Sequence, residues 1–152
     1  MTVSVRTALL ALHIAAAACW LGADVLAHVI GPRLDQESTE VATAWTRAQV
    51  WMHDRYYPAV AVAVLVTGVL LVVDGDWSWS SDFIWVGVGA IVLGASLGGG
   101  GLGSLSKRRL AALESGDAPT AAEVGRRLKA LGAVVTLLPI VAIVAMVAKW
   151  GA

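Results

Sequence analysis

The chain has 152 residues, of which 58% are apolar and 14% are charged, whereas an average soluble domain is about 45–50% apolar and about 25% charged. This composition excludes a soluble or disordered protein and indicates a small polytopic membrane protein. Eleven Lys and Arg residues balance eleven Asp and Glu residues, so no overall basic field attracts nucleic acid. The single cysteine excludes an intramolecular disulfide and any Cys-x-x-Cys site.

Four apolar runs are long enough to cross about 30 Å of hydrocarbon, which takes about 20 helical residues. They cover residues 7–30, 57–73, 83–102 and 131–148. Because the bilayer offers no water to satisfy backbone groups, each run must be helical. The sequence therefore predicts an all-α fold, a single integral membrane four-helix bundle. The lipid bilayer is the partner expected for such a bundle.

The linkers are predicted to contain helices as well. In residues 35–57, apolar side chains recur every three or four residues, which is typical of a helix lying at a membrane interface. We expect this cytoplasmic interfacial helix to turn into the second span at Pro58, because proline is tolerated in a first helical turn. Thr120 and Glu123 form the pattern of a capping box that opens the fourth helix, and Pro139 predicts a kink inside it.

The distribution of cations predicts the orientation. Nine of the eleven lie in the two linkers that follow the first and third spans: Arg33, Arg47, Arg55, Lys107, Arg108, Arg109, Arg126, Arg127 and Lys129. Because short cytoplasmic loops carry the excess of Lys and Arg, these linkers should be cytoplasmic and both termini should lie outside. The expected location is a bacterial inner membrane.

Ionisable residues within the spans occur only in the first one. At 100° per residue, His13, Trp20, Asp24 and His28 fall within an arc of about 80°. Such residues are costly in lipid and are functional candidates by default. We therefore expect this stripe to face the interior of the bundle. The structural alternative remains open, in which His13 is a satisfied core residue and Asp24 pairs with His28 or with an arginine at the inner face.

Depth along the helix separates these residues into two groups. His13 and His28 are fifteen residues apart, or about 22 Å, so they cannot share one metal ion. Asp24 and His28 are one turn apart near the inner face, and the linker helix brings Met52 and His53 to the same level. This predicted inner cluster suits a copper ion, which accepts nitrogen and thioether ligands. It also suits a b-type haem held axially by His28 and His53.

The third span is rich in small residues. Ala90, Gly94 and Gly98 repeat at four-residue spacing, a pattern that lets helices approach closely. We expect close helix packing on this face, and the Gly94/Gly98 surface is a candidate contact for a homo-oligomer or a larger membrane complex. The sequence has no Ser-His-Asp grouping, His-Glu-x-x-His motif or phosphate loop, so a hydrolase is not expected.

The first half of the chain resembles the membrane domain of the copper-resistance protein D family and related four-helix bacterial membrane proteins. The resemblance covers about residues 8–73 and depends on His13, Trp20-Leu-Gly22, Pro32-Arg-Leu34 and Thr67-Gly68. It implies a role in copper uptake or delivery, with His13 matching the first-helix histidine of the family. The chain departs from that role in having no Met-rich or His-rich outward segment.

Three functions follow as hypotheses. The first is a protein that binds or moves copper through His13, Asp24, His28, His53 and Met52. The second is a redox protein that holds haem b between His28 and His53. The third is an accessory subunit without chemistry of its own, which uses the glycine face to join a larger membrane complex.

Overall fold

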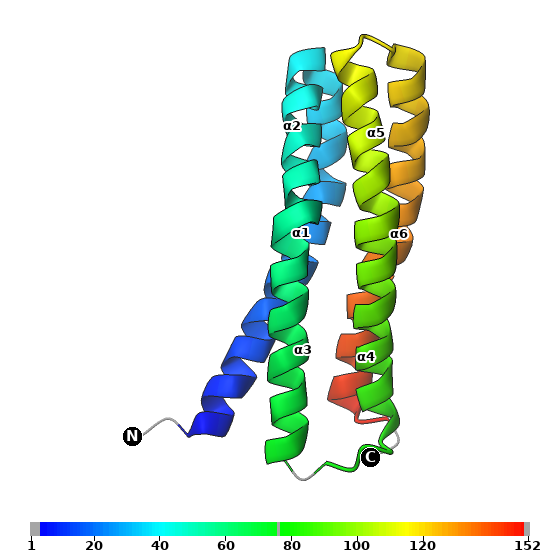
Figure 1. Cartoon of the computed structure of the whole chain (residues 1–152). Helices are drawn as coiled ribbons and strands as arrows, with labels where there is room; N and C mark the ends of the chain where they lie inside the picture. Colours follow the sequence, from blue (N-terminus) through cyan, green and yellow to red (C-terminus); the bar gives the residue numbers. More distant parts are fainter. Residues whose placement is uncertain (1–3, 76, 151–152) are drawn as a thin grey trace.

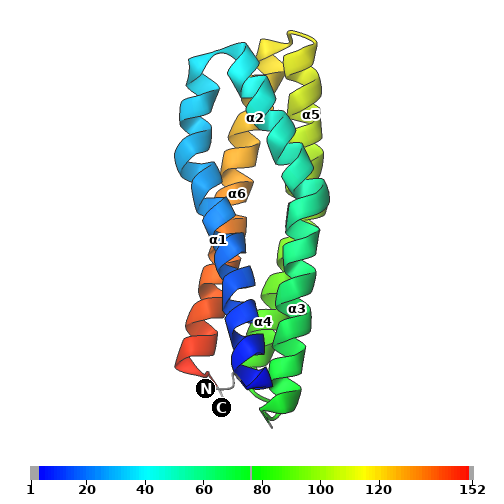
Figure 2. The same cartoon turned by 90° about the vertical axis from the view of Figure 1, so that its left-hand side faces the viewer.

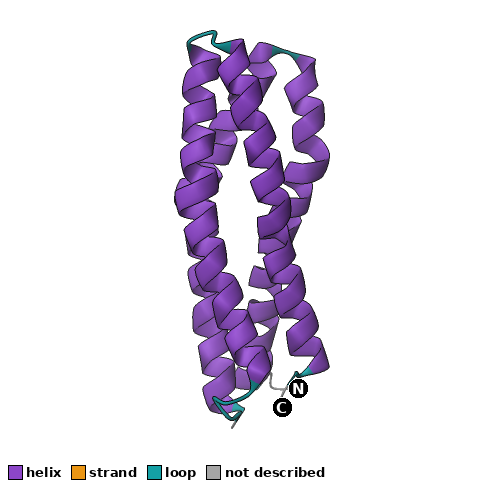
Figure 3. Ribbon diagram, turned by 90° about the vertical axis from the view of Figure 1, so that its right-hand side faces the viewer, coloured by secondary structure: helices purple, strands orange, loops and turns teal. Residues whose placement is uncertain are grey.

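The computed structural model describes residues 4–75 and 77–150 and is built from four long helical rods joined by short turns (Figures 1 and 3). The second and third rods each contain a π-helical segment between two α-helices. The elements are α1 (Val5–Glu37), α2 (Thr39–Trp51), η1 (Met52–Tyr56), α3 (Tyr57–Asp74), α4 (Asp82–Ala95), η2 (Ser96–Leu102), α5 (Gly103–Glu114) and α6 (Ala118–Ala148).

All four rods are long and apolar enough to span a membrane. Large apolar side chains stay exposed along them, for example Leu12, Val62, Val92 and Val144. An exposed apolar surface that extends over every helix suits a lipid environment. The predicted all-α fold with four long apolar helices is therefore confirmed, and each rod extends beyond the span predicted for it.

Both chain termini lie at one end of the bundle, and the turns at Ser38 and Ser115 lie at the other (Figures 1 and 2). We call these the termini end and the linker end. Ser38 ends α1 and caps α2, because its hydroxyl accepts a hydrogen bond from the Val41 N–H at 3.2 Å. Such a cap satisfies one of the free N–H groups of a helix start.

The helix predicted over 35–57 is present, but it continues into α3 as one helical rod instead of turning at Pro58. Pro58 lies in the first turn of α3, directly after the π-helical segment η1. There the Tyr57 N–H donates to the Met52 carbonyl, five residues back. The wider π turn accommodates the proline without breaking the rod.

The predicted capping box of the last helix was wrong. α6 begins at Ala118 with Asp117 as its N-cap, and the Asp117 carboxylate accepts a hydrogen bond from the Thr120 N–H at 3.1 Å. Pro119 lies in the first turn, where its missing N–H costs nothing. Because Asp117 caps the helix three residues before Thr120, Thr120 is not the N-cap. Glu123 pairs with Arg127 on the surface instead.

Glycines let large side chains lie close to neighbouring helices. Trp20 packs on Gly94, where an added Cβ would lie 3.1 Å from the indole ring. His13 packs in the same way on Gly68, at 3.1 Å. Trp20 and Asp24 are buried, so α1 turns its polar stripe toward the interior as predicted.

Candidate functional site

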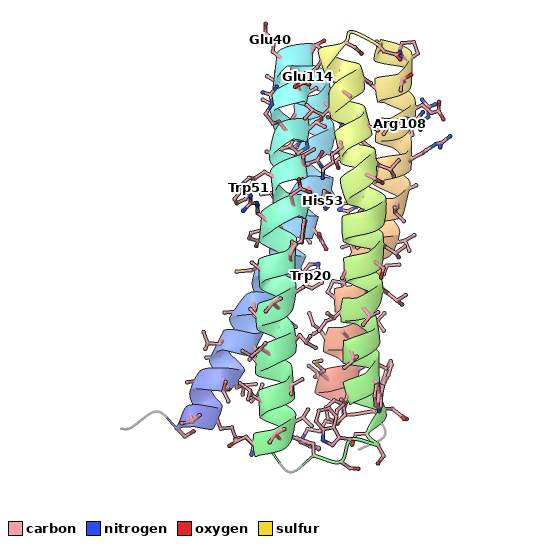
Figure 4. All side chains as sticks on the ribbon, in the orientation of Figure 1. Trp20, Glu40, Trp51, His53, Arg108 and Glu114 are labelled. Atoms are coloured by element: carbon pink, nitrogen blue, oxygen red, sulfur yellow. The ribbon has the colours of Figure 1, made fainter. Side chains whose placement is uncertain are left out.

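The described residues line a partly open central cavity of about 220 Å³ between α1, α2, α5 and α6, with η1 and the start of α3 also contributing to its wall. Asp24, His28, Met52 and His53 all line this cavity. These are the four residues that the sequence predicted at one level near the inner face. Figure 4 shows His53 in the upper half of the bundle and Trp20 below it, nearer the termini end.

Asp24 is buried and is only half satisfied. Its Oδ1 accepts a hydrogen bond of 2.7 Å from the Tyr57 hydroxyl. Its Oδ2 is buried and has no hydrogen-bond partner in the described part of the chain. A carboxylate oxygen left without a partner in a buried site is costly, so the cavity presents an acceptor that suits a cation or a donor.

His28 is held in a defined tautomer. Its Nδ1 lies 2.8 Å from the Asp24 carbonyl oxygen, and a carbonyl can only accept, so Nδ1 carries the proton. The Nε2 atom therefore has a free lone pair. The ring lies over Gly132, where an added Cβ would be 3.4 Å from Nε2, so a glycine provides the space for this side chain.

His53 lies in η1 and enters the cavity from the second rod. Its ring stacks on Tyr57 with centroids 5.3 Å apart, and its Cβ lies 3.5 Å from the position of a Cβ added at Gly103. Its Nδ1 is buried without a hydrogen-bond partner among residues 4–75 and 77–150. Isolated π turns occur frequently at functional sites, and here one carries both Met52 and His53.

Charged side chains line the cavity toward the linker end. Arg109 is buried, and its Nη2 lies 2.8 Å from Asp35 Oδ1. Lys129 approaches the other oxygen of Asp35 at 3.8 Å. The Arg109 Nε has no hydrogen-bond partner in the described residues. One acid on α1 thus holds cations from α5 and α6 beside the cavity.

Sequence reasoning did not single out two groups of this site. Tyr57 was treated only as the first residue of the second span, and Arg109 was counted only as a cytoplasmic charge. A signal for Arg109 is present in the sequence, because Asp35 follows the first span directly and needs a partner. Nothing in the local pattern distinguishes Tyr57 from Tyr56, since only the register of α3 against α1 selects the residue that reaches Asp24.

His13 is separate from this site. It does not line the central cavity, and it contributes to two apolar cavities nearer the termini end. The Thr67 hydroxyl donates to the Ala63 carbonyl at 2.6 Å, so its oxygen accepts from the His13 Nδ1–H at 2.9 Å. The separation of His13 from His28 agrees with the depth estimate from the sequence.

Among the described residues, His, Cys, Asp and Glu side chains alone do not assemble a complete metal centre. Within residues 4–75 and 77–150, no three His, Cys, Asp or Glu side chains lie close enough to hold one ion together. The two imidazoles and the Met52 side chain share a cavity, and Asp24 is engaged by Tyr57. A metal held here needs the Met52 thioether or a ligand from outside the chain.

The glycines of the predicted contact face on the third span differ in what surrounds them. Gly94 is buried under Trp20 of the same chain, whereas an added Cβ at Gly98, Gly99 or Gly100 would meet nothing within 4 Å. Gly94 therefore serves packing inside the chain. A homo-oligomer or complex contact through the remaining glycines stays a prediction.

Comparison with known proteins gives no evidence on function, so the function is argued from the geometry of the site. No protein-family model, no curated protein and no solved structure matches this chain.

Proposed function

We propose that this chain is a multi-pass membrane protein that binds copper in its central cavity, with His28, His53 and Met52 as ligands. One observation carries the proposal. Two imidazoles line the same cavity, and each has a ring nitrogen without a hydrogen bond in the described residues: His28 Nε2, left free by the bond from Nδ1 to the Asp24 carbonyl, and His53 Nδ1, which is buried. A buried polar nitrogen without a partner is costly unless a ligand satisfies it.

The donor set suits copper more than a hard cation. Imidazole and thioether ligands select Cu(I), whereas magnesium and calcium prefer oxygen. His28 also has the arrangement common to metal-binding histidines, in which one ring nitrogen donates to a backbone carbonyl and the other binds the metal. Asp24, whose Oδ2 has no partner among the described residues, offsets the charge of the ion.

The location we propose is a bacterial inner membrane, with the linker end in the cytoplasm and both termini outside. The excess of Lys and Arg in the two linkers supports this orientation. In this orientation His13, with its free Nε2, lies nearer the outer face and receives an ion that the central cavity then holds.

A haem b held by His28 and His53 is the second candidate. The observation that favours it is the position of Arg109 and Lys129, which line the same cavity as the two histidines. Their cations are suitable partners for the carboxylate groups of a haem. Bound haem would supply one-electron chemistry at this site.

One experiment separates these candidates. The protein is purified in detergent, its absorption spectrum is recorded oxidised and dithionite-reduced, and metal content is measured before and after incubation with Cu(I) under reducing conditions. We expect about one copper per chain, lost in His28→Ala and His53→Ala and weakened in Met52→Leu. Met146→Leu is the matched control for Met52→Leu and should keep the copper, because Met146 does not line the central cavity.

Other outcomes have definite meanings. A Soret band that disappears in His28→Ala and His53→Ala would replace the copper proposal with the haem one. A protein that stays free of copper and haem after both are supplied would refute both. The accessory-subunit hypothesis would then be the one to pursue.

A further inference from the structure

The termini end contains a second and larger cavity, separate from the central cavity that holds the proposed copper ligands His28, His53 and Met52. It has a volume of about 340 Å³ and lies between α1, α3, α4 and the end of α6. Its walls are mainly apolar, with Leu10, Val69 and Ile91 among them, and His13 also lines it. We call this cavity the outer groove.

The outer groove is lined by two cations and by no acidic side chain among the described residues. Arg6 and Lys149 are the two cations that lie outside the basic linkers, and both line the outer groove. No acidic side chain lines it, and neither cation forms an ion pair, in the part of the chain that the structure describes. Two cations from opposite ends of the sequence therefore converge on one apolar groove.

Lys149 is held at this position by the backbone. It adopts a left-handed conformation (φ 51°) after the last turn of α6, and its N–H donates to the Ala145 carbonyl. The next carbonyl, that of Trp150, accepts a hydrogen bond of 3.0 Å from the Phe83 N–H at the start of α4. The Lys149 ammonium lies 5.0 Å from the centre of the Trp77 ring, a cation–π distance.

We propose that the outer groove binds one anionic membrane lipid. The phosphate of its headgroup lies between Arg6 and Lys149, and an acyl chain enters the apolar groove toward His13. Charge complementarity selects this ligand, because two unpaired cations favour an anionic headgroup and apolar walls favour an acyl chain. Aromatic side chains such as Trp77 favour the headgroup level of a bilayer, where such a phosphate lies.

The test measures lipid binding to the full chain in detergent by native mass spectrometry. Dioleoyl phosphatidylglycerol is the anionic probe, and phosphatidylcholine with the same acyl chains is the neutral one. We expect one tightly bound phosphatidylglycerol per chain and weaker binding of phosphatidylcholine. Since each cation near a membrane surface contributes measurably to the binding of anionic lipid, the double variant Arg6→Ala/Lys149→Ala should bind phosphatidylglycerol about tenfold more weakly.

Two further variants make the result specific. Arg55→Ala/Arg108→Ala removes the same charge from exposed sites outside the groove and should keep the phosphatidylglycerol affinity of the wild type. Leu10→Trp fills the groove without changing charge and should weaken both lipids. Arg6→Lys/Lys149→Arg should retain the preference for the anionic lipid, which separates loss of charge from loss of folding.

The proposal is overturned if the wild type binds both lipids equally. It is also overturned if Arg55→Ala/Arg108→Ala weakens phosphatidylglycerol binding as much as Arg6→Ala/Lys149→Ala, since that result indicates general surface attraction. Copper content, measured on the same samples, should not change. The two proposals can therefore fail independently.

Discussion

The two halves of the bundle are held together by different interactions. In the linker half, formed by α2, α5 and the adjoining parts of α1 and α6, ion pairs join neighbouring helices, as in Arg109–Asp35 and Lys107–Asp54. In the termini half, formed by α3, α4 and the remaining parts, the described residues form no ion pair. Large side chains pack on glycines in both halves, as Trp20 does on Gly94 and Trp45 on Gly31. The central cavity lies where the two halves meet.

The membrane position proposed above accounts for this contrast. Inside a bilayer, apolar burial gives helices no advantage over lipid contact, so close packing and hydrogen bonds hold them together. Outside the hydrocarbon, charged side chains are solvated at low cost and pair across helices. In the proposed position, the central cavity lies at the boundary between these two environments.

The largest expected effect is on the linker half. Arg109→Gln leaves the largely covered Asp35 carboxylate with only Lys129 nearby at 3.8 Å, and breaking a buried pair costs about 3–5 kcal/mol. We expect a loss of about 3 kcal/mol in the free energy of unfolding, measured by SDS titration in mixed micelles. Arg47→Gln is the control, because the Arg47–Glu114 pair is exposed and should contribute less than about 1 kcal/mol.

An overpacked contact tests the termini half. Gly94→Leu drives a side chain into Trp20, which already lies 3.1 Å from the position of the new Cβ, and overpacking typically costs about 1–3 kcal/mol. Gly89→Leu is the matched control on the same helix, because nothing lies within 4 Å of a Cβ there. Equal thermal stability of the two variants would contradict close packing of Trp20 on Gly94.

Tyr57→Phe tests the region around the central cavity, where the two halves meet. It removes the 2.7 Å hydrogen bond to Asp24 and keeps the aromatic ring. A hydrogen bond to a charged group contributes about 1.5–3 kcal/mol, so we expect a loss of about 1.5 kcal/mol in the same SDS titration. Tyr56→Phe is the control, since its hydroxyl donates to the Cys19 carbonyl and not to Asp24. A larger loss in Tyr56→Phe would show that the Asp24 contact is not the stabilising one.

The smallest effect concerns the exposed cap of α6. Hydrogen bonds with Thr120 lower the pKa of the Asp117 carboxyl, so its contribution to stability is present above the unfolded pKa of about 3.9 and is lost as pH falls through the lower folded value. Wild type should therefore be more stable than Asp117→Ala at pH 7, and the difference should shrink at acidic pH. Asp117→Asn should show less pH dependence, which thermal unfolding from pH 7 to pH 3 measures.

The sequence predicts the four rods and the inward face of α1, because both depend on local composition and periodicity. It also predicts that Asp24, His28, Met52 and His53 lie at one level, since rise per residue sets depth. It does not predict the role of Tyr57 or Arg109, because these depend on the register between rods far apart in the chain. Pro58 was misjudged since a π turn, with no sequence signature here, removes the expected bend.

The two π-helical segments also change which face of each rod points toward its neighbours. In η1 and η2 the closing bonds run from Tyr57 to Met52 and from Gly103 to Gly98, five residues back instead of four. Each extra residue rotates the helix that follows by about 100° relative to a continuous α-helix. The sequence can therefore set the face of α2 that contacts α5 independently of the face of α3 that contacts α1. Removing one residue from η1 would rotate one of these faces away from its partner helix.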